Sequence, residues 1–286
     1  MNAGELLNQL NAKLKNDSTE QDAQLILAHV LGHPRTWLLA HLDAHLTPPQ
    51  IESTTQTFDE YQAGTPLPYI LGHWDFFGLE FDITKDVLIP RPETEMLVEN
   101  AIDWLRTHPE KRTIADIGTG SGAIAITLAL QIPDAHIIAT DISPAALQVA
   151  KHNAEKFNVQ DQIEFMECDL LPPSSFIIPH SPFDLICSNP PYIPTGTLHQ
   201  LPIFGREPTL ALDGGADGLD VYRRLFEIAP DWLAPGGMML FEIEATLGVR
   251  ALSLAFDHFS NASIHLHQDL AGNDRLLEII PASESY

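Results

Sequence analysis

Four consecutive residues, Asn189-Pro190-Pro191-Tyr192, combine groups that can hold a flat amino group. Proline has no backbone N–H, so the carbonyl oxygens of Asn189 and Pro190 stay free to accept hydrogen bonds from a ligand. The Asn189 side chain adds an acceptor, and Tyr192 offers a ring that can pack on the face of the group. Amide and aryl amine nitrogens are poor nucleophiles, so binding both N–H hydrogens and fixing the nitrogen in line with an electrophile would favour transfer of a group to nitrogen. A rigid proline turn without chemistry is the alternative interpretation.

A second candidate site is Gly118-Thr119-Gly120-Ser121-Gly122, considered together with Asp141. Alternating glycines allow backbone dihedrals that are barred to other residues, and they remove the β-carbons that would keep a ligand away from the main chain. Asp141 follows the next apolar run at roughly the 20-residue offset at which an acidic residue binds a ribose. The spacing is not that of a dinucleotide site and no Lys-Ser/Thr follows, so we expect a ligand with a ribose and no pyrophosphate. A glycine turn that serves packing alone is the alternative, and Asp141 argues against it.

Alternating strands and helices must position these two motifs. Apolar runs separated by helix-compatible stretches predict an α/β fold with a mostly parallel sheet, an antiparallel last strand from a closing hairpin, and helices on both faces. The expected strands are 113–117, 135–140, 163–170, 183–188 and 238–244, with the closing pair 263–267 and 276–280. Ligands of such sheets bind beyond the carboxyl ends of the strands. Both motifs, and also Asp169-Leu170, fall at such ends.

The pattern of apolar and turn-forming residues divides the chain into three parts. Residues 1–65 have the apolar spacing of helices and predict a small helical bundle without a catalytic pattern, whose expected role is substrate recognition. Residues 66–90 contain two β-prone runs around Gly78 and predict a linking β-hairpin. Residues 91–286 contain both motifs and form the expected catalytic domain. Two histidine pairs at helical spacing in the first part lack a third ligand, so we expect no metal.

Arg91 and Glu93 lie in the proline-rich stretch that precedes the first helix of the catalytic part. The prolines fix an extended approach, and Glu93 falls in the first helical turn, where the helix dipole favours an acid. Two interpretations stay open: the stretch is a rigid start to the helix, or the two side chains line the substrate cleft.

Composition narrows the classes of function. Fifteen Lys+Arg against 39 Asp+Glu give a formal net charge of −24, which disfavours nucleic acid because such binding depends on Lys and Arg displacing counterions. The two cysteines lie far apart and form no C-x-x-C pair, so neither a disulfide framework nor a zinc cluster is expected. No basic leader and no apolar run of roughly 20 residues is present, so we expect a cytoplasmic protein without a membrane partner. We also expect a monomer.

The motifs resemble those of a known enzyme family. Asp116 to Gly122 is similar to the D-x-G-x-G-x-G signature of class I methyltransferases, and Asn189 to Tyr192 is similar to the motif of methyltransferases that act on adenine N6 or glutamine amides. Over nearly its full length the chain resembles the release factor glutamine methyltransferases (HemK-like). The stretches that carry this resemblance are 68–72 with Phe76, 89–95, 116–122, 189–192, 207–208, 211–219 and 272–275. The pair formed by 90–95 and 189–192 is specific, whereas the glycine turn alone is not.

The resemblance implies a cofactor, a substrate and a role for each site residue. The cofactor is S-adenosylmethionine, with the turn from Gly118 to Gly122 under its methionine and ribose parts and Asp141 on both ribose hydroxyls. Asp169 and Leu170 would border the adenine, although some relatives carry tryptophan where Leu170 stands. Asn189, Pro190, Pro191 and Tyr192 would hold the amide of the glutamine in the Gly-Gly-Gln loop of class 1 peptide chain release factors, with Asn189 also next to the cofactor.

Three other functions stay open at this point. The same tetrapeptide would serve an N6-adenine methyltransferase of DNA or RNA, which the net charge of −24 disfavours. A glutamine of a ribosomal protein is a closer rival, because only the resemblance favours a release factor. A cofactor-binding scaffold without catalysis is disfavoured, because Asn189 and both prolines are intact.

Overall fold

The computed structural model describes residues 1–14, 18–171 and 182–282. The chain divides into two units, Met1–His73 and Trp74–Tyr286. Among the described residues, none of the helices has the length and apolarity that a membrane span requires. The described side chains also bring no three His, Cys, Asp or Glu residues together in a way that could hold a metal ion.

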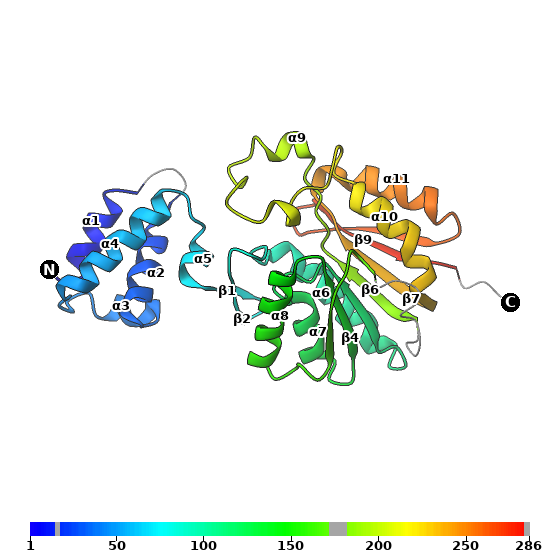
Figure 1. Cartoon of the computed structure of the whole chain (residues 1–286), viewed down its shortest axis with the longest axis horizontal. Coiled ribbons are helices and arrows are strands. Elements are labelled where there is room, and N and C mark those ends of the chain that lie inside the picture. The colour runs from blue at the N-terminus through cyan, green and yellow to red at the C-terminus, as the bar shows by residue number, and fades with distance from the viewer. Residues whose placement is uncertain (15–17, 172–181, 283–286) are drawn as a thin grey trace. The chain divides into compact units, whose positions relative to one another are not determined.

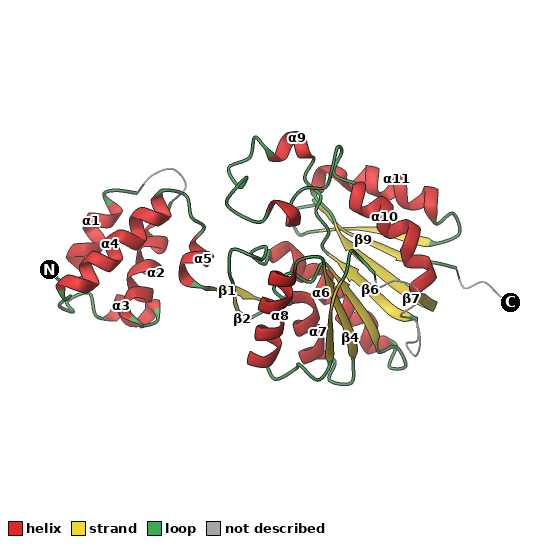
Figure 2. Ribbon diagram, viewed as in Figure 1, coloured by secondary structure: helices red, strands yellow, loops and turns green. Residues whose placement is uncertain are grey.

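The first unit consists of five helices (Figures 1 and 2). Capping residues start three of them: Asn2 and Thr19 each accept a backbone hydrogen bond, and the Thr47 N–H donates to Gln50 Oε1 at 2.9 Å. Gly32, at φ +67°, ends the second helix before Pro34. The helices are α1 (Ala3–Asn11), α2 (Glu20–Leu31), α3 (Arg35–Ala40), α4 (Pro48–Gln62) and α5 (Leu67–Leu71).

A two-stranded hairpin lies around Gly78, as the sequence predicts. Its strands are β1 (His73–Phe76) and β2 (Leu79–Asp82), and its turn residues Phe77 and Gly78 have φ values of +53° and +71°. Positive φ at both turn positions gives the twist that a two-residue hairpin favours. The hairpin begins only at His73, because Leu67–Leu71 form α5 with a proline in the first turn and Gly72 at its end.

In the described part of the second unit, seven strands form one sheet in the order β5-β4-β3-β6-β7-β9-β8. The strands from β5 to β7 are parallel, and β9 runs antiparallel to both β7 and β8. This confirms the predicted α/β sheet with an antiparallel last strand (Figure 2). The strands are β3 (Thr113–Ile117), β4 (His136–Asp141), β5 (Ile163–Glu167), β6 (Phe183–Ser188), β7 (Leu233–Glu242), β8 (Ser263–Gln268) and β9 (Asp274–Ile280).

Helices cover both faces of this sheet (Figure 1). On one face α6 (Glu95–Thr107) contacts α7 (Ala123–Gln131), which in turn contacts α8 (Pro144–Lys156). On the other face α10 (Asp220–Ile228) packs on α11 (Gly248–His258). The two last helices enclose an apolar core in which Phe226 and Phe241 meet edge to face with ring centroids 5.4 Å apart.

The bounds of β5 and β7 differ from the predicted ones, and β5 ends at Glu167 rather than at Leu170. β7 begins at Leu233 rather than at Met238, because residues 234–237 form an irregularity in the pairing with β6 that still leaves Leu233 opposite Phe183. The long segment after Tyr192 is mostly irregular, as the sequence predicts. It contains only the short helix α9 (Thr195–Leu198) and a 3₁₀ turn (Thr209–Ala211).

Strand register decides where the two motifs meet. Ile117, the last residue of β3, pairs with Ser188 of β6 and with Thr140 of β4. Gly118, Asn189 and Asp141 therefore follow at the same edge of the sheet, because the carboxyl ends of parallel strands lie side by side.

Asn153 on α8 connects the hairpin to the glycine turn. Its Oδ1 accepts the Asp82 N–H at 2.9 Å, and its Nδ2 donates to the carbonyls of Asp82 at 3.0 Å and of Ser121 at 2.9 Å. The side chain is fully buried, so water cannot replace these partners.

We expect Asn153→Ala to lower the free energy of unfolding by about 2–4 kcal/mol, because it removes three hydrogen bonds to backbone groups, of which the one to Ser121 is buried and the two to Asp82 are partly buried. Urea unfolding followed by circular dichroism measures this loss. Lys151→Ala, an exposed change on the same helix, is the control and should stay within about 0.5 kcal/mol of the parent chain. Equal stability of the two variants would contradict the assignment.

Candidate active site

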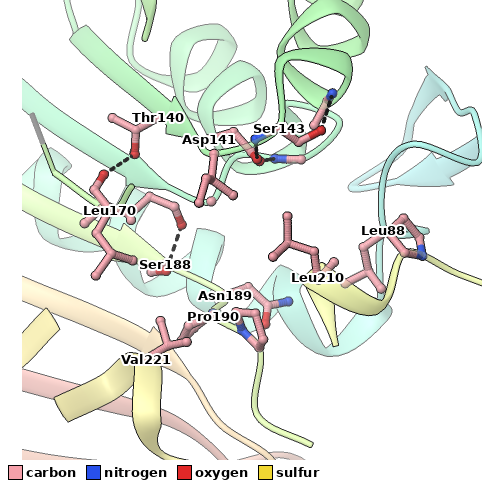
Figure 3. A pocket seen from close by; sticks show the side chains of 18 of the residues that line it. Leu88, Thr140, Asp141, Ser143, Leu170, Ser188, Asn189, Pro190, Leu210 and Val221 are labelled. Atoms are coloured by element: carbon pink, nitrogen blue, oxygen red, sulfur yellow. Dashed lines mark hydrogen bonds between the residues drawn. The ribbon is translucent and has the colours of Figure 1, made fainter. Parts of the chain in front are cut away.

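A cavity of about 350 Å³ lies beyond the carboxyl ends of β3, β4, β5 and β6 (Figure 3). Residues from each strand end line it, together with residues from 86–88, 208–213 and α10. Its charged lining consists of four aspartates and one arginine, namely Asp86, Asp141, Asp169, Asp213 and Arg224. The volume suits a small organic ligand, and the excess of carboxylates favours a cation.

Gly118 and Gly120 form the part of the glycine turn that faces the cavity. Their φ values are +72° and +56°, and a β-carbon added to either would meet no atom within 4 Å. The turn thus offers bare backbone to the space where a ligand fits. Gly122 differs, because a β-carbon there would lie 2.8 Å from Ile126 Cδ1 and 3.3 Å from Ala150 Cβ. This glycine allows α7 to pack closely against α8.

Thr119 and Ser121 are buried behind the turn and do not line the cavity. The Thr119 hydroxyl donates to Asp116 Oδ2 at 2.6 Å, and the same oxygen accepts the Ala125 N–H at 3.2 Å. Burial raises the pKa of Asp116 to about 6, despite these two hydrogen bonds. Asp116 therefore fixes the shape of the turn from within the core.

Asp141 points from the end of β4 into the cavity (Figure 3). Its Oδ2 accepts the Gly120 N–H at 2.9 Å, and its Oδ1 accepts the Ser143 N–H at 2.8 Å. Burial raises the pKa of this carboxyl above its usual value. Each oxygen has a second lone pair, so the carboxylate can still accept one hydrogen bond on each side. That is the arrangement that two neighbouring ribose hydroxyls require.

Asp169 and Leu170 border the cavity beyond β5. Leu170 has φ +70°, an unusual conformation for a leucine, and its carbonyl accepts the Thr140 hydroxyl at 2.6 Å. The Asp169 carboxylate pairs with Arg224 of α10 at 2.6 Å, and both side chains are about half exposed. The backbone hydrogen bond thus fixes the conformation at Leu170, whereas the Asp169–Arg224 ion pair lies at the solvent-exposed opening of the cavity.

Asn189, Pro190 and Pro191 line the cavity directly after β6, and Figure 3 shows the first two. The Asn189 Nδ2 donates to Thr94 Oγ1 at 3.1 Å. Among the described residues, none donates a hydrogen bond to Asn189 Oδ1 or to the backbone carbonyls of Asn189 and Pro190. Three acceptors at this turn are therefore free for a ligand.

Tyr192 does not line the cavity. Its side chain is partly buried against the apolar core, and its hydroxyl donates to Glu242 Oε1 at 3.4 Å. Burial, with the Glu242 carboxyl nearby, raises the pKa of Tyr192 well above its usual value. This side chain anchors the turn from behind.

Arg91 and Glu93 are also not among the residues that line the cavity. The Arg91 guanidinium pairs with Glu207 Oε1 at 2.5 Å, and Glu207 Oε2 accepts the Ile89 N–H at 3.1 Å. Glu207 is buried, so Arg91 connects the long segment after Tyr192 to the stretch before α6. Glu93 is exposed.

Three residues that support the site have no signal from spacing or periodicity, although Thr94 and Glu207 lie in stretches that carry the resemblance. Thr94, directly before α6, and Glu242, at the end of β7, reach the Asn-Pro-Pro-Tyr turn, and Glu207 reaches Arg91 from a distant part of the chain. Two glycines, Gly214 and Gly218, are required by the turn itself. An added β-carbon would lie 2.8 Å from the Pro191 carbonyl at Gly214 and 2.4 Å from the Tyr192 carbonyl at Gly218. The resemblance marks these glycines, but no spacing rule explains them.

We expect Gly214→Ala to displace the Pro191-Tyr192 backbone and to lower the rate of methyl transfer at least about tenfold, because small displacements of a positioned group are costly. Cofactor affinity, measured by calorimetry, should stay within a few-fold. Gly196→Ala is the matched control, since a β-carbon there meets nothing within 4 Å, and its melting temperature should equal that of the parent chain. A normal rate in Gly214→Ala would show that the turn tolerates the shift.

Comparisons with known proteins agree with this geometry. A family model described as PrmC N-terminal domain matches residues 5–72, and one described as methyltransferase small domain matches residues 93–201. The chain is 43% identical to the release factor glutamine methyltransferase of Moorella thermoacetica over 258 residues, 89% of this chain and 88% of that one. It is 38% identical to that of Bacillus anthracis over 267 residues, 92% and 93% of the two chains.

Solved structures show the same fold at low sequence identity. The catalytic domain of hMettl16, solved in complex with hairpin 6 of the MAT2A 3′UTR, has a TM-score of 0.55 and 16% identity, and the match covers 86% of this chain and 88% of that one. The fold is therefore that of a class I methyltransferase, and the identity to the curated relatives over about nine tenths of both chains decides the family. The chain belongs to the release factor glutamine methyltransferase family.

Proposed function

We propose that this protein transfers a methyl group from S-adenosylmethionine to the side-chain amide nitrogen of the glutamine in the Gly-Gly-Gln loop of class 1 peptide chain release factors. One observation supports this above all: the glycine turn after β3 and the Asn-Pro-Pro-Tyr turn after β6 share one cavity. The names of the relatives supply the substrate, and the amide-binding turn fits it.

The cavity fits the cofactor by shape and by charge. Gly118 and Gly120 leave open space where β-carbons would project, and Asp141 keeps a free lone pair on each oxygen. Asp169 and Leu170 border the part of the cavity that would take the adenine. When bound, S-adenosylmethionine supplies an electrophilic methyl group on a sulfonium, and the aspartate-rich lining favours that positive charge.

The acceptors of the turn hold the substrate amide. Asn189 Oδ1 and the Pro190 carbonyl accept one amide hydrogen each, which fixes the orientation of the nitrogen. Both hydrogen bonds strengthen as the nitrogen becomes positive during attack, so they stabilise the transition state more than the ground state. Pro191 limits the cavity beside them, and Tyr192 packs behind the turn.

The remaining parts of the chain shape the approach of the protein substrate. Glu93 is exposed and lies two residues after Arg91, which pairs with Glu207 of the long segment after Tyr192. We therefore assign Glu93 to the wall that receives the substrate loop. The helices of residues 1–65 recognise the release factor, residues 66–90 link them, and residues 91–286 catalyse the transfer. The enzyme acts as a cytoplasmic monomer.

Nucleic acid is disfavoured as a substrate. The charged residues that line the cavity, among those the structure describes, are four aspartates and one arginine, and the whole chain has a formal net charge of −24. Phosphate groups would be repelled by both.

Asp141→Ala should weaken S-adenosylmethionine binding at least about tenfold, because two hydrogen bonds to a charged group are lost. Calorimetry measures the affinity. Asp161→Ala removes the same charge at an exposed position outside the cavity and should leave the affinity unchanged. Equal affinity of both variants would refute the ribose assignment. If Asp141→Ala does not fold, Asp141→Asn, which keeps the size of the side chain, replaces it in the measurement.

Asn189→Ala should lower turnover at least about a hundredfold while cofactor affinity stays within a few-fold, because the lost acceptor acts on the amide in the transition state. Labelled cofactor incubated with a release factor, its Gln→Ala variant, a ribosomal protein and RNA measures both the rate and the substrate. Label in the release factor alone, lost in its Gln→Ala variant, is the expected result. Label in ribosomal protein or RNA would replace the proposed substrate.

A further inference from the structure

Four side chains from three elements form a hydrogen-bonded chain behind the Asn-Pro-Pro-Tyr turn. Asn189 Nδ2 donates to Thr94 Oγ1 at 3.1 Å, and the Thr94 hydroxyl donates to Glu242 Oε2 at 2.5 Å. The other oxygen of Glu242, Oε1, accepts the Tyr192 hydroxyl at 3.4 Å. One carboxyl therefore contacts the first residue of the turn through Thr94 and the last residue directly.

The direction of these hydrogen bonds follows from the chemistry of the carboxylate. An ionised carboxylate only accepts, so the single hydroxyl hydrogen of Thr94 is directed to Glu242. The Thr94 oxygen can then only accept from Asn189, which must present its NH₂ group and not its carbonyl oxygen. Asn189 Oδ1 is left on the other side of the amide, where the described residues give it no donor.

From this geometry we propose that Glu242 and Thr94 are positioning residues, which set the amide of Asn189 so that Oδ1, and not Nδ2, faces the substrate. The proposal rests on the proposed function, because an N–H2 substrate needs an acceptor at this place. The reversed amide would point a donor at the hydrogens of the substrate, and the two groups would repel each other.

Burial makes this hydrogen-bonded chain rigid. Thr94 is 5% exposed and Glu242 is 3% exposed, so water cannot substitute for either partner. The Tyr222 hydroxyl donates to the backbone carbonyl of Glu242 at 2.5 Å and fixes the end of β7. Charged and titratable groups that act on Glu242 are Glu93, Arg275, Tyr192 and Tyr222.

Protonation of Glu242 would remove the constraint, because a carboxylic acid can donate to Thr94 and allow the opposite direction of the chain. Burial raises the pKa of Glu242 to about 7, while the Thr94 and Tyr192 hydrogen bonds and the Arg275 charge oppose that shift. The active form is the ionised one, so turnover should fall as the pH drops through that value.

Thr94→Val and Thr94→Ser form the matched pair that tests the chain. Valine keeps the shape and removes the hydroxyl, so turnover should fall about 30-fold, whereas serine keeps the hydroxyl and should stay within about threefold. S-adenosylmethionine affinity should stay within about threefold in both variants. Equal loss in serine and valine would show that packing, and not the hydroxyl, matters.

A double-mutant cycle separates positioning from a structural role. If Thr94 acts through Asn189, Thr94→Val should cause less than about a threefold further loss in the Asn189→Ala background. Losses that multiply in the double variant would overturn the proposal. Failure of the parent chain to methylate the release factor would instead overturn the proposed function, so the two failures are distinguishable.

Glu242→Gln supplies a second variant if Thr94→Val does not fold. Its amide can both donate and accept, so it cannot enforce one direction, and turnover should fall about tenfold. The fall in turnover of the parent chain near neutral pH should be absent in Glu242→Gln. The same fall in both proteins would assign it to another group and contradict the role of Glu242.

Discussion

The register between β3 and β6 is the constraint on which the site depends. Because Ile117 pairs with Ser188, the glycine turn and the Asn-Pro-Pro-Tyr turn leave the sheet next to each other, on the same edge. The Ser188 hydroxyl donates to the Ile117 carbonyl at 2.8 Å and fixes this pairing at its last residue. Side chains alternate between faces along a strand, so a slip of one residue would turn every core residue of β6 to the wrong face. The packing of the hydrophobic core therefore keeps the cofactor site and the substrate amide site at a fixed distance from each other.

Close backbone packing fixes the catalytic turn on that edge. The backbone of Ile193 pairs with residues 212–214, and neither Gly214 nor Gly218 leaves space for a β-carbon against Tyr192. Arg91 and Glu207 connect the other end of the long segment to the stretch before α6. Pro190 and Pro191 have no backbone N–H groups, so the main chain of the turn cannot be held by hydrogen bonds from these two residues. Its position depends instead on close packing against neighbouring backbone and on hydrogen bonds to its side chains. Thr94 and Glu242 supply the second kind of support.

Burial of carboxyl groups recurs around the cavity and serves two purposes. Asp116 and Glu242 are fully buried, and burial raises the pKa of each, to about 6 and about 7. Both act on the shape of a turn and not on the ligand directly. Asp141 is less buried and keeps lone pairs for a ligand. An acidic protein with an acidic cavity suits a cationic cofactor.

The sequence by itself determined the strands that end in the two motifs, since β3 and β6 have the predicted bounds, and it determined the family through those motifs. Apolar periodicity and glycine or proline chemistry are local, so they can be seen in a stretch of ten residues. Only the tertiary structure decided which distant side chains support the site. Thr94 and Glu242 lie 148 residues apart, and Arg91 and Glu207 lie 116 apart, and no local rule relates them. Their meeting depends on strand order and helix packing, which bring the ends of β6, β7 and α6 together after the chain has folded.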